Sequence, residues 1–163
     1  MKLSARCLLS LIVVFFVGLV QGCGGSKTVA EKIVPASGVI KLDGKPVAGI
    51  NIRFTPINET KSVGGAWAVT KDDGSFTVMH WTNKEGITPG SYMVSFSRMV
   101  KQDGSPLGPN DSPAMVRAKE TIAARWNNPG DKMAEMTRRV DVPEAGKSDI
   151  EFSITSAKNA PKK

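Results

Sequence analysis

The sequence predicts an all-β domain, a seven-stranded antiparallel β-sandwich. From Ala36 onward, apolar and polar residues alternate in short segments, which is the period of strands with one buried face. Glycine, proline and Asp-Gly pairs separate these segments, as they do in antiparallel sheets. Such strands predict two packed sheets, because a single sheet would leave its apolar face in water.

The first four strands are expected at residues 37–42, 48–56, 66–71 and 75–81. Their inward side chains should include Ile40, Leu42, Ile50, Ile52, Phe54, Phe76 and Val78. Asp-Gly turns follow the first and third strands, and Gly and Asp both favour tight turns. We therefore expect two hairpins, one closed at 43–46 and one at 72–74.

Three further strands are expected at residues 90–100, 136–142 and 149–155. The fifth strand should direct Tyr92, Val94 and Phe96 inward, and the seventh Ile150, Phe152 and Ile154. The short linker "PEAGKS" predicts that the last two strands form a hairpin.

An insertion, residues 101–135, separates strands five and six. Four of its apolar residues recur at helical spacing: Met115, Ala118, Ile122 and Trp126. This spacing predicts one short helix that covers an open end of the sheets, with Trp126 as its anchor, and the alternative is an irregular loop. Residues 36–156 form the predicted domain, and the tail 157–163 lacks apolar periodicity and is expected to be disordered.

The N-terminus has the pattern of a secretion leader. Lys2 and Arg6 precede an apolar stretch, residues 8–20, that is shorter than the roughly 20 residues of a membrane span. Residues 1–22 are therefore predicted to be a signal peptide and residues 23–35 a flexible tether. An ordinary cleavage site near Gly22 would leave Cys23 as a free thiol.

The stretch "LVQGCGGS" resembles the lipobox of bacterial lipoproteins, although Val20 and Gln21 are less usual at their positions. The resemblance implies that Cys23 carries acyl chains that anchor the protein to the cell membrane or outer membrane. It also implies that the domain lies on the periplasmic or extracellular side.

The stretches "GVIKLDGKPVAGINIRFTP", "TKDDGSFTV" and "ITPGSYMVSFS" resemble carboxypeptidase regulatory-like domains of bacterial envelope lipoproteins. The resemblance covers residues 36–155 and implies a transthyretin-like (prealbumin-like) Greek-key β-sandwich. Its motifs are turns and strand starts, so it implies a fold and no reaction.

Charge and cysteine content limit the classes of partner. The net charge is +7, but the basic residues are scattered and form no stripe, so nucleic acid is not an expected partner. Cys7 and Cys23 are the two cysteines of the chain, and neither lies in the predicted domain. The domain must therefore be stabilised by its core without a disulfide.

Catalytic and metal-binding motifs are not recognised in the sequence. His80 is the single histidine, and it shares the inward parity of Phe76 and Val78, which favours a structural role. A zinc site needs several Cys or His ligands. Asp43, Asp72, Asp73 and Asp111 show no calcium-loop spacing and are interpreted as turn residues. The predicted protein is not an enzyme and has no cofactor.

Aromatic residues are the remaining candidates for a binding site. Trp81 has outward parity and precedes a polar segment that contains Asn83 and Lys84, so these three residues are the possible ligand contacts. The alternative is that Trp81 folds back over a sheet edge. Trp67 shares parity with Val69 and is expected in the core. The sequence thus predicts an envelope module with a structural, adhesion or protein-interaction role, or alternatively a carbohydrate or cell-wall binding module.

Overall fold

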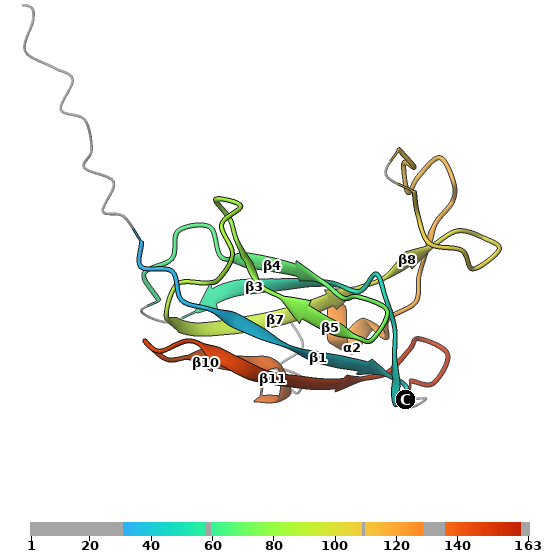
Figure 1. Cartoon of the computed structure of the whole chain (residues 1–163). Coiled ribbons are helices and arrows are strands. Elements are labelled where there is room, and N and C mark those ends of the chain that lie inside the picture. Colours follow the sequence, from blue (N-terminus) through green and yellow to red (C-terminus); the bar gives the residue numbers. More distant parts are fainter. Residues whose placement is uncertain (1–30, 58–59, 109, 129–135, 161–163) are drawn as a thin grey trace, which may run out of the picture. The chain divides into compact units, whose positions relative to one another are not determined.

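The computed structural model describes residues 31–57, 60–108, 110–128 and 136–160, so the predicted signal peptide and Cys23 lie outside the described residues. These residues form an all-β structure (Figure 1). A four-stranded sheet contains β11 (Lys147–Ile154), β1 (Ala36–Leu42), β2 (Lys45–Pro46) and β5 (Ser75–Thr77), with β1 between β11 and the other two. A five-stranded sheet has the order β10 (Arg139–Val142), β7 (Gly90–Ser97), β3 (Asn51–Ile57), β4 (Ala66–Val69) and β6 (Met79–His80).

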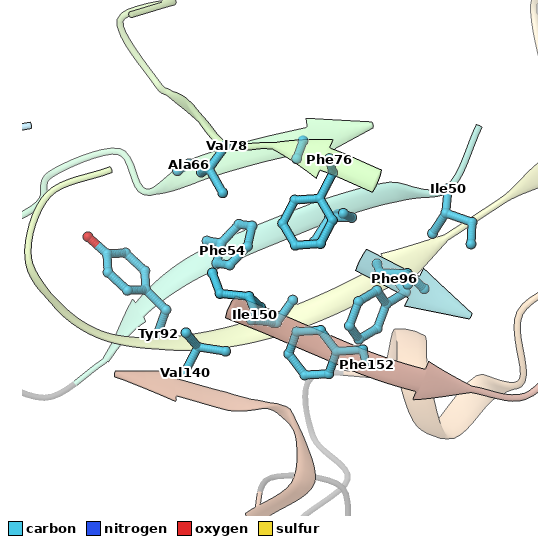
Figure 2. Close-up of a cluster of buried hydrophobic side chains, with 14 of the residues drawn as sticks. Ile50, Phe54, Ala66, Phe76, Val78, Tyr92, Phe96, Val140, Ile150 and Phe152 are labelled. Carbon is cyan, nitrogen blue, oxygen red and sulfur yellow. The ribbon is translucent and has the colours of Figure 1, made fainter. Parts of the chain in front are cut away.

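One hydrophobic core lies between the two sheets (Figure 2). Phe54 of β3 packs on Phe76 of β5 with ring centroids 6.4 Å apart. Phe96 of β7 meets Phe152 of β11 edge to face at 4.9 Å. Apart from Trp67, the inward strand residues predicted from alternation are all buried, because each strand presents every second side chain to the opposite sheet.

The predicted strand pairing is wrong at three turns. After the two-residue hairpin of β1 and β2, the chain crosses to the five-stranded sheet and forms β3. The turn at 72–74 is present, with Gly74 N–H bonded to the Lys71 carbonyl, but β4 pairs with β3 and β6 while β5 pairs with β1. The turn at 72–74 therefore passes the chain to the other sheet, whereas the turn after β1 closes the hairpin with β2 and the chain crosses only after β2.

The last two strands also lie in different sheets. Strand β10 pairs with β7, whereas β11 pairs with β1 in parallel, so the expectation of a wholly antiparallel structure is corrected. The Lys147 N–H donates to the Pro35 carbonyl at 2.9 Å. This bond starts β11 beside the start of β1, which fixes the parallel direction.

The predicted insertion helix is wrong over most of its length. Met115 is 84% exposed, and Arg117 has a φ of +48°, which interrupts helical geometry. Residues 119–120 form β9 (Lys119–Glu120), which pairs with β8 (Met99–Val100), and the loop between β8 and β9 projects from one end of the sheets (Figure 1). The one helix of the described insertion is the single turn α2 (Ala124–Asn127).

Trp126 of α2 anchors the insertion, as predicted. It is buried against Phe96 with ring centroids 6.2 Å apart, and its indole N–H donates to Thr155 Oγ1. In the adjoining segment Arg138 is wholly buried and donates to the carbonyl groups of Val94, Trp126 and Asn128. These bonds join α2 to β7.

The boundaries of the predicted tether and tail are corrected. Val34 is buried and pairs with Ile87, so residues 31–35 pack on the domain, and the prediction that they belong to a flexible tether is wrong. At the other end, the Ala157 N–H donates to the Thr121 carbonyl, and Ala160 packs against the core. Residues 157–160 are therefore ordered.

Candidate ligand-binding face

The outer face of the five-stranded sheet brings together residues from separate parts of the chain. Strand register places Met79, Trp67, Arg53 and Ser95 in one row across β6, β4, β3 and β7. A neighbouring row contains Val69, Asn51 and Ser97. These residues share the face because strands alternate their side chains with a period of two.

Trp67 lies on this outer face and is 44% exposed, so its predicted place in the core is wrong. The inward residues of β4 are Ala66 and Ala68, which pair with Phe54 and Ile52 of β3. Small side chains fit the core there because their partners are large. The apolar character of Trp67 was a misleading signal, and the two flanking alanines indicate the correct parity.

Trp81 is 48% exposed, which confirms its outward parity. Its ring rests on Gly64, where an added Cβ would lie only 2.4 Å from the Trp81 Cγ. The backbone N–H of Trp81 donates to the Gly65 carbonyl at 3.3 Å. Trp81 thus packs on the chain just before β4, an inner strand of the sheet, and still exposes about half of its surface.

Trp67 and Trp81 line the same open hollow, which has a volume of about 890 Å³. The polar residues of its lining are Asn51, Arg53, Thr55, Ser95, Ser97 and Asn127. Asn127 and Ser97 both donate to Glu120 Oε2, at 3.2 and 2.5 Å. Glu120 therefore fixes two polar side chains at one end of the hollow.

Asn83 and Lys84 are not among the residues that line this hollow. Asn83 has a φ of +61°, and its N–H donates to the His80 carbonyl, so it forms the turn after Trp81. The sequence did not identify Trp67, Arg53, Asn51, Ser95 or Asn127 as site residues. The sequence indicates that Asn51 and Arg53 point outward from β3, but it does not indicate which strands lie beside β3.

His80 belongs to a buried polar cluster at one end of the five-stranded sheet. It is 1% exposed; its Nε2 lies 3.0 Å from Glu31 Oε2, and its Nδ1 accepts from the Thr82 N–H at 3.4 Å. The Thr88 hydroxyl donates to the same Glu31 oxygen at 2.8 Å. His80 is thus buried, as its inward parity predicts, and Glu31 is the partner that the sequence did not identify.

The environment of Glu31 favours its charged form. Burial alone would raise its pKa, but hydrogen bonds from Thr88, His80, Val63 and Ser62 lower the pKa from 4.5 to about 2. The cluster contains the group types of a hydrolytic triad, yet both nitrogens of His80 are engaged and the ring is closed to solvent. Its geometry stabilises the junction between residues 31–35 and the sheets.

Three of the four aspartates considered for calcium bond to other groups of the protein. Asp73 accepts from the Ser75 N–H, Asp43 accepts from the Ser156 N–H, and Asp111 pairs with Lys101 at 2.7 Å. Within the described ranges, no three acidic, histidine or cysteine side chains are grouped closely enough to hold a metal ion.

In the part of the chain that the structure describes, no helix has the length and apolar character needed to cross a membrane. No protein-family model, curated protein or solved structure matches the chain.

Proposed function

We propose that this protein is a non-enzymatic, lipid-anchored module of the bacterial cell envelope that binds polysaccharide on the outer face of its five-stranded sheet. The observation that carries the proposal is the pair of half-exposed tryptophans, Trp67 and Trp81, which line one open hollow together with several polar side chains. Exposed indole rings are unfavourable in water and are common at binding surfaces.

The side chains of the hollow fit sugars. Flat indole rings can stack on the C–H faces of pyranose rings, and Asn51, Arg53 and Asn127 can bond to hydroxyl groups. The open shape suits a polymer chain better than a small enclosed ligand. An adhesion or cell-wall-binding role follows from this chemistry.

The proposal includes the transthyretin-like Greek-key β-sandwich of carboxypeptidase regulatory-like domains. Two sheets that share one core support this fold, and the parallel pairing of β1 with β11 is a feature that distinguishes one sandwich topology from another. The closed environment of His80 supports a non-enzymatic role.

Polysaccharide binding is tested by retention of the full chain on isolated bacterial cell-wall polysaccharide. We expect retention by the unaltered protein and loss of retention in Trp67→Ala and in Trp81→Ala. Val39→Ala, an exposed apolar residue of the four-stranded sheet, is the matched control and should be retained. Retention that survives both tryptophan changes would contradict the proposal. If the same face instead captures an envelope protein, the ligand is a protein and not a polysaccharide.

The anchor is tested separately with Cys23→Ser. Acyl chains on Cys23 would place the protein in the membrane fraction, with the domain on the periplasmic or extracellular side. The serine variant should move to the soluble fraction. If it stays with membranes, Cys23 is not the anchor.

A further inference from the structure

Arg53 lies at the centre of the candidate face. It stands on β3 between Trp67 of β4 and Ser95 of β7, its direct partners across the sheet. Its side chain is exposed and lines the hollow. A ligand that stacks on Trp67 would therefore lie within reach of the guanidinium group.

The charge of Arg53 has no protein partner among the described residues: no carboxylate lies within ion-pair distance and no aromatic ring accepts it. Arg139, on the same outer face, is different because it pairs with Asp141 at 3.1 Å. Arg125 lies 5.1 Å from the ring centroid of Trp126. Among the residues that the structure describes, none accepts a hydrogen bond from the Arg53 guanidinium, so its donors can serve a ligand.

Arg53 is also the one charged residue in the described lining of the hollow. Glu120 is an acidic residue that contacts two lining residues, Ser97 and Asn127. Its two oxygens already accept from those side chains and from the N–H groups of Arg98 and Ile122. The local charge therefore favours an anionic ligand.

We propose that the polysaccharide bound by this face carries carboxylate groups, with Arg53 binding a carboxylate and the two tryptophans stacking on sugar rings. This inference rests on the proposed function. A guanidinium group can donate two parallel hydrogen bonds to one carboxylate, which gives both affinity and orientation. The ligand class is thus a chain of uronic acids or of amino sugars with an acidic substituent.

The test is calorimetric titration of the full chain in a sugar-free polyoxyethylene detergent. The acidic probes are oligogalacturonate, alginate and hyaluronan oligosaccharides, each paired with its carboxyl-reduced form, and the neutral probes are cello- and chito-oligosaccharides. We expect at least one acidic probe to bind at least tenfold more tightly than its reduced form. Added salt should weaken the acidic complex.

Three variants locate the effect. Arg53→Gln should reduce the preference for the acidic form to less than twofold, and Arg53→Lys should retain part of it. Arg139→Gln removes an exposed arginine of the same sheet and should keep the full preference. A melting temperature unchanged by Arg53→Gln separates ligand binding from a structural effect.

The outcomes distinguish this inference from the proposed function. If neutral or reduced probes bind as tightly as acidic ones, the inference is wrong and the polysaccharide-binding function stands. If acidic probes are preferred equally by Arg53→Gln, the assignment to Arg53 is wrong. If no probe binds, both the inference and the proposed function are contradicted.

Discussion

The outer faces of the two sheets differ although the strands beneath them follow the same alternation. On the four-stranded sheet, Lys41 of β1 pairs with Glu151 of β11 at 3.4 Å, and Val39 and Ser153 lie beside them. On the five-stranded sheet, Trp67 and Trp81 flank a hollow in which Arg53 has no charged partner among the described residues. The first face is a solvated surface, and the second has the composition of a binding surface.

The difference between the two outer faces shows which side chains the fold requires and which it does not. Both sheets need large apolar side chains on their inner faces, because those faces form one core. Neither needs a tryptophan outside, since short polar residues and ion pairs suffice on the four-stranded sheet. The exposed indole rings are therefore the feature that demands a functional explanation.

The largest expected effect comes from removing both rings. In Trp67→Ala/Trp81→Ala, affinity for cell-wall polysaccharide should fall at least about 100-fold, because tryptophans that act as the energetic centre of a binding surface typically contribute about 2 kcal/mol or more each. Val39→Ala/Lys41→Ala, on the other outer face, should change affinity less than about twofold. Calorimetry measures both. Equal losses in the two double variants would remove the distinction between the faces.

A second prediction concerns the stability of the protein at acidic pH, which depends on Glu31. The pKa of Glu31 is lowered from 4.5 to about 2 in the folded protein. Its interactions therefore stabilise the fold fully above pH 4.5, and this stabilisation is lost as the pH falls from 4.5 to 2. The unaltered protein should exceed Glu31→Gln in free energy of unfolding by up to about 3 kcal/mol at pH 6. This difference should shrink steadily below pH 4.5.

The acid effect should be local to the five-stranded sheet, because Glu31 bonds to His80 immediately before Trp81. Urea unfolding at several pH values gives the stability difference, and hydrogen exchange gives its location. Exchange should rise first at residues 80–82, ahead of β1 and β11. A stability difference that is constant from pH 6 to pH 2 would contradict the role assigned to Glu31.

A smaller effect is expected from Gly64→Ala. The added methyl group meets the Trp81 ring and must displace it, while Trp67 is not in its path. Affinity should therefore fall several-fold with little change in melting temperature. Iodide quenching of tryptophan fluorescence reports the shift, and an unchanged quenching curve would show that Trp81 does not rest on Gly64.

The smallest effect is expected at the ion pair of the four-stranded sheet. Both side chains of the Lys41 and Glu151 pair are largely exposed, so removing either one should cost less than about 1 kcal/mol. Binding of polysaccharide should not change. A clear loss of binding in Lys41→Ala would show that the binding face is on the four-stranded sheet and not on the five-stranded one.

Alternation within each strand was predictable, because burial of every second residue is a local property of the strand. Ile52, Phe54, Val94 and Phe96 are all inward as the sequence indicates. Pairing was not predictable, because a turn such as 72–74 gives the same local signal whether the next strand joins the same sheet or the opposite one. Long-range packing decides between these outcomes.

The candidate site was predicted only where parity alone determines exposure. The prediction that Trp81 points outward is confirmed. The prediction that Trp67 points inward is wrong, because it relied on the apolar area of Trp67 and not on the small alanines beside it, which occupy the inward positions. Arg53 could be placed on an outer face, but its position between Trp67 and Ser95 depends on sheet order. A site assembled from several strands becomes visible only when their register is known.

The most direct test of the central claim is nuclear magnetic resonance of the indole N–H signals during titration with cell-wall polysaccharide fragments. The chain has three tryptophans, and the indole N–H of Trp126 is bonded to Thr155 in the core. We predict that the Trp67 and Trp81 signals shift together while the Trp126 signal stays in place. Binding that moves none of the three signals, or that instead perturbs the backbone around Val39 and Lys41, would contradict the account.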